Sequence, residues 1–184
     1  PDVMTAVPRL LEKVYDKIYA KGAALTGIKK ALFFWAVNLG LVYEPYGQNG
    51  WWYEFQLKIA RKLIFTKWQE ALGGKLRAVA SGSAALQPRL ARVFNAAGIP
   101  IMEGYGLTET SPVVAVNDFR DGNFKIGTVG KPIADTEIQI AEDGEILVKG
   151  PQIMMGYYKD PDLTAQVIKN GYFHTGDIGE VDAE

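Results

Sequence analysis

The chain of 184 residues contains no cysteine. This absence excludes disulfide bonds, thiolate nucleophiles and cysteine-ligated zinc. The only histidine is His174, so the sequence offers neither a His-rich metal site nor a Ser-His-Asp relay that can be placed. Lysine and arginine together number 20 against 21 acidic residues. Such a balance lacks the basic excess typical of nucleic-acid-binding proteins, so no nucleic-acid partner is expected.

Long apolar runs are also missing. The longest spans residues 31–37, far short of the roughly 20 residues of a membrane-spanning helix. No leader follows Pro1, which favours a cytoplasmic protein, with peripheral contact to a membrane left open. Because the chain stops at Glu184 directly after a polar motif, we expect a fragment of a larger protein. Cut strand edges and uncovered apolar faces would make that fragment self-associate, for example as a dimer.

Apolar residues recur every three to four positions in the first part of the chain, which predicts packed amphipathic helices. The expected helices span residues 8–20, 28–39 and about 51–72. The tryptophans Trp35, Trp51 and Trp52 are expected to fill a core or to pack between subdomains rather than to contact lipid.

The pattern then changes to strand, loop, helix and strand, at residues 76–80, 81–84, 86–97 and 99–102. This order predicts a βαβ unit with parallel strands. Ligands of parallel sheets bind beyond the carboxyl ends of the strands. Those ends are the loops 81–84 and 103–109, which we therefore expect to lie side by side.

The last third is predicted to be rich in strands, at residues 125–130, 137–141 and 145–149, with an Asp143-Gly144 hairpin turn. The expected fold class is α/β: helices packed on a partial, mainly parallel sheet, followed by a small antiparallel subdomain. We expect one domain portion over residues 1–123 and a β-rich partial barrel over 124–184.

Two common nucleotide signatures are absent. Neither Gly-Lys pair has the flanking residues of a phosphate-binding Walker loop. Gly104-Tyr105-Gly106 begins like a dinucleotide fingerprint, but Glu109 occupies the position of the third glycine.

The same segment, GYGLTET at 104–110, nevertheless suits a phosphate ligand. Gly104 and Gly106 would let the backbone approach a ligand while Tyr105 presents an aromatic face. Thr108 supplies a hydroxyl, and the carboxylate of Glu109 could lie beside a phosphate only with a bridging cation such as Mg²⁺. The alternative is an ordinary glycine-rich turn capped by polar side chains.

Four strings in order resemble the adenylate-forming superfamily, which includes acyl-CoA synthetases. They are SGSAAL at 81–86, GYGLTET at 104–110, GEILVKGPQIMMGYY at 144–158 and GYFHTGDIG at 171–179. The helical segments VMTAVPRLLEKVYDKI and KKALFFWAVNLG look like the long-chain fatty acyl-CoA synthetase branch. The resemblance covers essentially the whole chain.

The resemblance implies a fold and a two-step reaction, in which a fatty acid and ATP give an acyl-adenylate and CoA then displaces AMP. By motif, the backbone of Ser83 and Ala84 would line the adenine. Tyr105, between its two glycines, would stack on the adenine face, and Asp177 would bind the ribose hydroxyls. Thr108 would contact phosphate and Glu109 would hold Mg²⁺, which makes these two the expected catalytic residues.

The chain departs from the family pattern in what it lacks. A Ser/Thr/Gly-rich phosphate loop ending in lysine, an arginine after the TGD motif and a catalytic lysine would all lie outside these 184 residues. We therefore expect the isolated fragment to be inactive. Three alternatives remain: another carboxylic acid as substrate, a non-catalytic nucleotide-binding or interaction module, and, for Asp177, a simple turn residue. No role is assigned to His174.

Overall fold

The computed structural model describes residues 1–182, apart from the side chain of Asp121, and these residues form two compact units. The first unit contains residues 1–103 and 117–130, and the second contains residues 104–116 and those from 131 onward. These two units are defined by contacts within the backbone of this chain. The boundary expected between residues 123 and 124 is one between domain portions of a longer protein. That boundary therefore stays a prediction. The last two residues of the expected second portion, 183 and 184, lie outside the described residues.

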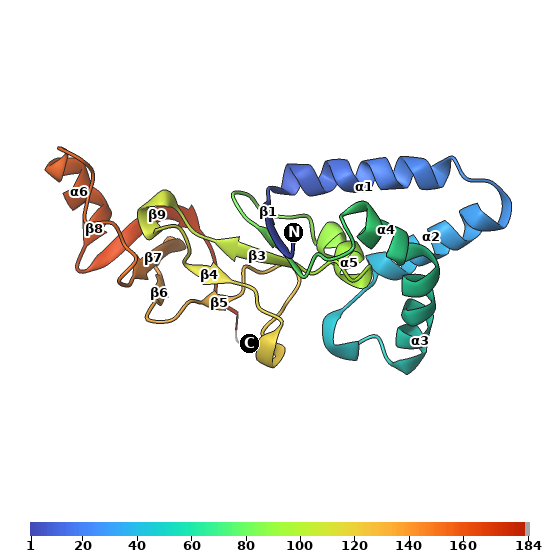
Figure 1. Ribbon diagram of the computed structural model, residues 1–184. Coiled ribbons are helices and arrows are strands. Elements are labelled where there is room, and N and C mark those ends of the chain that lie inside the picture. The colour runs from blue at the N-terminus through green and yellow to red at the C-terminus, as the bar shows by residue number, and fades with distance from the viewer. Residues whose placement is uncertain (183–184) are drawn as a thin grey trace. The chain divides into compact units, whose positions relative to one another are not determined.

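Helices dominate the first unit (Figure 1). They are α1 (Pro8–Ala23), α2 (Gly27–Leu41), α3 (Trp51–Ala60), α4 (Thr66–Ala71) and α5 (Pro88–Ala96), with short 3-10 turns η1 (Pro45–Gly47) and η4 (Arg120–Gly122). Prolines stand in the first turns of α1 and α5, where a missing N–H costs nothing. The predicted helices are confirmed, with ends that differ by a few residues.

A π-helical turn, η2 (Arg61–Phe65), joins α3 to α4 without a break in the helix. The buried side chains Leu57 and Ala60 precede it, Phe65 ends it, and Trp68 follows. The inner face thus advances by five positions, from Ala60 to Phe65, where a regular α-helix would advance by three or four. The wider turn keeps both halves of the segment facing the same core.

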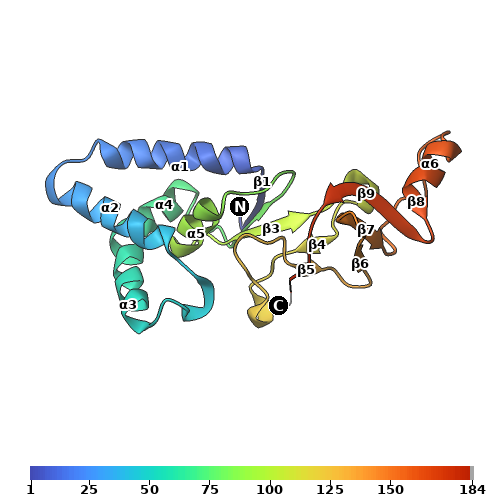
Figure 2. The same cartoon turned by 180° about the vertical axis from the view of Figure 1, so that it is seen from behind.

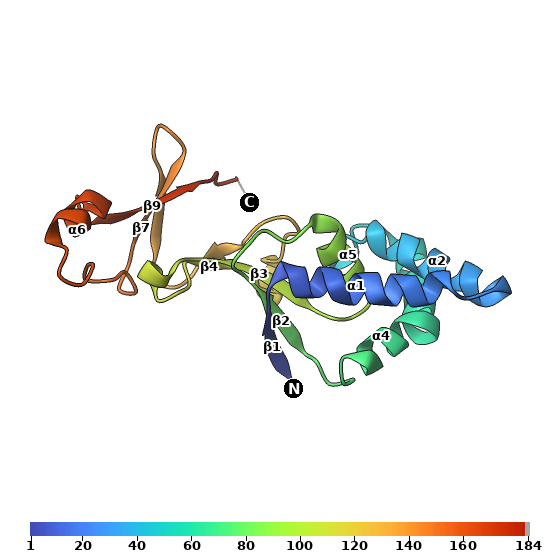
Figure 3. The same cartoon turned by 90° about the horizontal axis from the view of Figure 1, so that it is seen from above.

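Three parallel strands give the first unit its sheet. They are β1 (Val3–Ala6), β2 (Ala78–Ser81) and β3 (Ile101–Tyr105), of which β3 contributes its first three residues here. Strand β2 lies between β1 and β3 (Figure 3). Thr5 lies opposite Ala80, and Ala80 lies opposite Met102. The β2–α5–β3 segment confirms the predicted βαβ unit. Strand β1 was not predicted.

The core of the first unit is aromatic and aliphatic. The predicted inner face of α5 is buried throughout, with Leu90, Val93 and Phe94 all at 0% exposure. Trp35 packs partly buried against this core, as expected. Trp51 and Trp52 do not fill this core, because they are 79% and 56% exposed and their rings contact each other. The other expectation for these two residues, packing between subdomains, stays a prediction.

The second unit is built from antiparallel strands (Figure 2). Gly104 and Tyr105, the end of β3, pair with β4 (Ala115–Val116), which pairs with β5 (Lys131–Pro132). A second sheet has the order β6-β7-β9-β8. Its elements are β6 (Glu137–Ile140), β7 (Glu145–Lys149), β8 (Ile168–Lys169) and β9 (Tyr172–Ile178), with α6 (Pro161–Val167) before β8 and the 3-10 turn η3 (Thr108–Thr110) after β3.

Strands β6 and β7 match the predicted runs, and the Asp143-Gly144 turn joins them as predicted. The strand predicted at 125–130 is wrong, because these residues form turns. The buried amide of Asn117 donates to the carbonyls of Lys125 and Thr128 and accepts from the N–H of Lys125. One side chain thus occupies the backbone groups that a neighbouring strand would need. The fold class is mixed α/β with a parallel-rich sheet and an antiparallel sheet, as predicted.

Candidate functional site

The loop after β2 begins beside the end of β3, as expected from the parallel pairing. In the register of the first unit, Ser81 lies opposite Glu103. The carboxylate of Glu103 accepts a hydrogen bond of 3.2 Å from the N–H of Leu86, at the far end of the loop. Burial raises the pKa of Glu103, and the Leu86 hydrogen bond acts in the opposite direction. Glu103, to which the sequence analysis gave no role, thus pins this loop to the strand.

Within the loop, Ser83 and Ala84 are exposed, and Ser83 has a positive φ of 70°. Next to them, the hydroxyl of Ser81 is buried and has no hydrogen-bond partner among residues 1–182. A buried hydroxyl without a partner is costly, by about 1–3 kcal/mol. The loop therefore combines accessible backbone with a polar group that can still accept a partner.

The predicted loop at 103–109, of which all but Glu103 belongs to the second unit, is partly strand. Glu103, Gly104 and Tyr105 belong to β3, and the turn starts at Gly106. A Cβ at Gly106 would lie 1.8 Å from the carbonyl oxygen of Pro112, so this glycine accommodates the protein's own backbone. The buried hydroxyl of Thr110 accepts from the N–H of Leu107 at 2.9 Å and closes the same turn.

The turn η3 presents the two expected catalytic residues. Thr108 is exposed and Glu109 is half-buried. Tyr157, from the string GYY, donates its hydroxyl to Oε1 of Glu109 at 2.9 Å, and the N–H of Met154 donates to the carbonyl of Glu109 at 2.8 Å. The hydrogen bond to Glu109 raises the pKa of Tyr157, and desolvation and the negative charge of Glu109 act in the same direction. Two of the four motif strings are therefore joined at Glu109.

A third string joins them through Tyr105. The hydroxyl of Tyr105 donates to Oδ2 of Asp177 at 2.7 Å, although the two residues are 72 positions apart. Burial raises the pKa of Tyr105 to about 12, and the bond to Asp177 adds to the shift, whereas Thr175 opposes it. Asp177 itself is exposed on β9. Two residues that the motifs assign to one nucleoside thus meet within the second unit.

The fit to a magnesium ion follows from the donor set. Among the side chains that the structure describes, no group of three or more acidic or histidine residues could hold a metal ion. Mg²⁺ needs no such cage, because it is commonly held by one or two carboxylates together with substrate phosphates and water. Glu109, with the hydroxyl of Thr108 beside it, suits that mode of binding.

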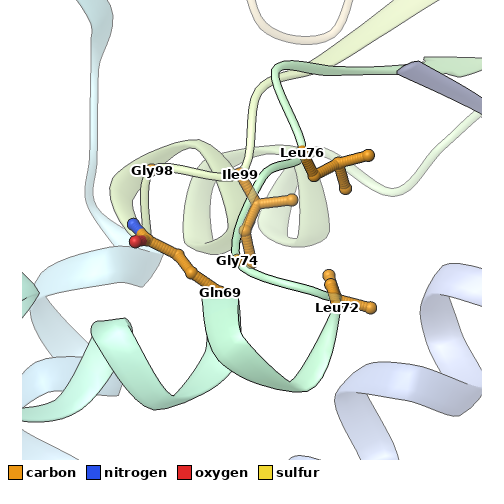
Figure 4. Close-up of a pocket in the computed structure, with 6 residues that line it drawn as sticks. All are labelled: Gln69, Leu72, Gly74, Leu76, Gly98 and Ile99. Atoms are coloured by element: carbon orange, nitrogen blue, oxygen red, sulfur yellow. The ribbon is translucent and has the colours of Figure 1, made fainter. Parts of the chain in front are cut away.

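The hollows of the first unit lie away from the predicted residues. One of about 50 Å³, shown in Figure 4, lies where the end of α4 meets the turn after α5. It is lined by Gln69, Leu72, Gly74, Leu76, Gly98 and Ile99. A second, open hollow of about 510 Å³ is mainly apolar and lies between α2 and α3. The first is too small for a nucleotide, and neither contains a predicted site residue.

No described helix combines the length and hydropathy that crossing a bilayer requires. Of the predicted site residues, Tyr105, Thr108, Glu109 and Asp177 belong to the second unit, whereas Ser83 and Ala84 belong to the first. Sequence reasoning missed Glu103, Thr110 and Tyr157. Thr110 is part of the GYGLTET string and Tyr157 is part of the string at 144–158, so both lay in motifs that indicated a site. Glu103 lies outside the motif strings.

Curated relatives match over nearly the whole chain. A long-chain-fatty-acid–CoA ligase, FadD15, of Mycobacterium tuberculosis is 38% identical over 187 residues, covering 100% of this chain and 30% of that protein. Long chain acyl-CoA synthetase 3 of Arabidopsis thaliana is 33% identical over 195 residues, covering 98% of this chain and 29% of its own length. The chain thus spans about 30% of the length of these relatives.

Solved structures give the same fold. An o-succinylbenzoate CoA synthetase of Bacillus subtilis in complex with an acyl-adenylate aligns with 98% of this chain and 29% of its own, with a TM-score of 0.61 at 21% identity. A structure of that enzyme described as a complex with ATP and magnesium ion aligns with 59% of this chain and 25% of its own, at 30% identity and a TM-score of 0.53. The model of one family, described as AMP-binding enzyme, matches residues 1–158. This chain therefore belongs to the AMP-binding enzyme family.

Proposed function

We propose that this chain is part of an ATP-dependent long-chain fatty acid–CoA ligase. The observation that supports the proposal most directly is the 2.7 Å hydrogen bond between Tyr105 and Asp177. It joins an aromatic ring suited to an adenine face to a carboxylate suited to a ribose diol. The names of the curated relatives support the fatty acid as substrate.

The proposed chemistry has two steps. An oxygen of the fatty carboxylate attacks the α-phosphorus of ATP, and pyrophosphate leaves. The thiol sulfur of CoA then attacks the acyl carbonyl carbon, and AMP leaves with the bonding electron pair. The fatty acid, ATP and CoA are thus the expected partners of the intact protein.

Each residue of the site has a proposed part. The backbone of the exposed residues Ser83 and Ala84 borders the adenine. Tyr105, at the end of β3, stacks on the base; Gly104 precedes it in the strand, and Gly106 begins the turn that follows. The carboxylate of Asp177 accepts from the ribose hydroxyls, since an ionised carboxylate is an acceptor only.

At the phosphates, the hydroxyl of Thr108 donates to a phosphate oxygen. Glu109 provides the carboxylate for Mg²⁺, which when bound supplies positive charge where negative charge develops on the α-phosphate. The hydroxyl of Tyr157 occupies Oε1 of Glu109 and so fixes the direction of its carboxylate. The carboxylate of Glu109 is thus held in place by Tyr157 before any ligand binds.

Glu109→Ala in the intact protein tests this proposal by pyrophosphate release with ATP, Mg²⁺ and a long-chain fatty acid. Adenylation should fall by at least about 100-fold. Glu142→Ala is the matched control, since Glu142 is an exposed glutamate in the β6–β7 turn. Near-normal adenylation in Glu109→Ala would remove Glu109 from its proposed role.

A second candidate is the adenylation of a different carboxylic acid. It is favoured by solved neighbours named as anthranilate and o-succinylbenzoate CoA ligases, at 27% and 30% identity over about 60% of this chain. A panel of fatty, aryl and amino acids with the intact protein separates the two. A third candidate, a non-catalytic nucleotide-binding or interaction module, would bind AMP or a protein partner in calorimetry but release no pyrophosphate.

Three further expectations stay predictions. The 184-residue chain alone should release no pyrophosphate, because it has neither the lysine-ending phosphate loop nor the lysine and arginine that the family resemblance implies. It should self-associate, and a monodisperse monomer in light scattering across concentrations would contradict this. Cytoplasmic location with peripheral membrane contact is testable by fractionating cells that express the intact protein.

A further inference from the structure

The ladder between β7 and β9 contains a pronounced irregularity. Leu147 lies opposite His174, and Glu145 lies opposite Ile178. Between these pairs, β7 has only Ile146, whereas β9 has three residues, 175–177. A bulge of this kind lifts residues out of the ladder and redirects their side chains. Here the lifted residues are the Thr-Gly-Asp motif.

Hydrogen bonds from the start of β7 hold each part of this bulge. The hydroxyl of Thr175 donates to the carbonyl of Ile146 at 2.8 Å. The N–H of Gly176 donates to Oε1 of Glu145 at 2.8 Å. The N–H of Asp177 donates in turn to the hydroxyl oxygen of Thr175 at 3.1 Å. Thr175 thus fixes the backbone of Asp177, and Glu145 fixes the backbone of Gly176.

Gly176 has a φ of 74°, a conformation that other residues adopt at a cost. A Cβ there would meet nothing within 4 Å, so the glycine serves the backbone conformation rather than close packing. The bulge therefore needs both this conformation and an acceptor for the N–H of Gly176. Glu145 provides that acceptor.

The second oxygen of Glu145 contacts the only histidine of the chain. Nδ1 of His174 lies 2.8 Å from Oε2 of Glu145. A carboxylate can only accept, so the proton of this bond is on Nδ1. The His174 bond, followed by that of Gly176, lowers the pKa of Glu145. The side chains of His174 and Glu145 are 26% and 20% exposed, so solvent screens this bond only in part.

We propose that Glu145 and His174 are positioning residues that hold the Thr175–Asp177 bulge in the shape in which Asp177 binds the ribose of ATP. This inference rests on the proposed function, since it assigns a cause to the geometry of its nucleoside site. His174 orients Glu145, and Glu145 fixes Gly176. The pair does not touch the nucleotide.

The test uses the intact protein and compares ATP with 2′-deoxy- and 3′-deoxy-ATP in pyrophosphate release. Wild type should prefer ATP by roughly tenfold or more over at least one deoxy analogue, because a hydrogen bond from that hydroxyl to a carboxylate is lost. Asp177→Ala should abolish this preference. If wild type releases no pyrophosphate, or if Asp177→Ala keeps the preference, the proposed function of the site fails independently of the present inference.

The variants of the pair decide the inference. Glu145→Ala and His174→Leu should raise the KM for ATP several-fold and reduce the ribose preference toward that of Asp177→Ala, with kcat changed less. His174→Asn places an amide N–H close to the position of Nδ1 and should restore the wild-type preference. His174→Gln, whose amide reaches the position of Nε2, should not.

A merely structural role gives a different pattern. Variants that only lose stability yield less active protein, which lowers the apparent kcat but leaves the KM and the ribose preference unchanged. That outcome would overturn the inference. So would equal preferences in His174→Asn and His174→Gln. Glu142→Ala, in the same hairpin and exposed, is the matched control and should behave as wild type.

Discussion

Gly106→Ala is the substitution whose cost the structure determines most directly. The added methyl carbon would lie 1.8 Å from the carbonyl oxygen of Pro112 and 3.0 Å from Cα of Val113. A Cβ atom almost never lies closer than 3.0 Å to another heavy atom, so the methyl carbon and the oxygen of Pro112 must separate by at least about 1.2 Å. No flexible side chain is available to absorb that movement.

The separation also breaks the buried contacts that close the turn. The hydroxyl of Thr110 lies 3.1 Å from the carbonyl of Pro112, and Thr110 is 0% exposed. Overpacking costs about 1–3 kcal/mol and a lost buried hydrogen bond about 1 kcal/mol, which together give about 2–4 kcal/mol. The matched control is Gly104→Ala, whose methyl would lie 3.4 Å from the carbonyl of Ala115 and should cost less than about 1 kcal/mol.

The assay must report on the second unit. All four tryptophans of the chain lie within residues 1–103, so tryptophan fluorescence follows the first unit. Hydrogen exchange of peptides covering residues 104–116, read by mass spectrometry, measures the second unit. Gly106→Ala should lower the protection of these peptides by a factor of about 30 or more, while Gly104→Ala stays near wild type. Equal protection in the two variants would refute the reasoning.

Three other predictions concern the core and two titrating groups. Phe94→Ala should lower the free energy of unfolding in urea by about 3–5 kcal/mol, because Phe94 is 0% exposed. The control Phe55→Ala, at 51% exposure, should lower it by less than about 0.5 kcal/mol. Similar losses in the two variants would contradict the assigned core. The pKa of Glu145 is lowered in the folded chain, so its contribution to stability is present above the unfolded value near 4.3 and is lost as the pH falls further. Acid titration of unfolding should therefore be shallower in Glu145→Gln, and identical pH profiles would count against the bond to His174. Absorbance at 295 nm should reveal a phenol with a pKa of about 12 that disappears in Tyr105→Phe, and its persistence would assign it elsewhere.

The helices were predictable from sequence because their burial follows the apolar period, as α5 illustrates with Leu90, Val93 and Phe94. Strand β1 was not predictable, since four residues, VMTA, carry no alternation and gain their structure from pairing with β2. The false strand at 125–130 has the opposite cause. Its composition favours a strand, but the amide of Asn117 occupies its backbone groups.

The site divides in the same way. The motif strings marked Tyr105, Glu109 and Asp177 as candidates. The bond between Tyr105 and Asp177 depends on how β3 and β9 pack, which no local pattern encodes. The same holds for the pair of Glu145 and His174, because histidine on a strand gives no signal of its partner. The sequence thus indicated which residues are candidates for the site, whereas their hydrogen-bond partners could be identified only from the fold.

The π-helical turn at Arg61–Phe65 has a consequence for how chain length can vary in this family. It adds one residue to a turn of an otherwise regular helix, and such turns behave as single-residue insertions. A relative one residue shorter here could continue as an uninterrupted α-helix and still direct the equivalents of Leu57 and Trp68 inward. An alignment that gaps this segment by one position would therefore describe an evolutionary change in helical pitch, with no loop gained or lost.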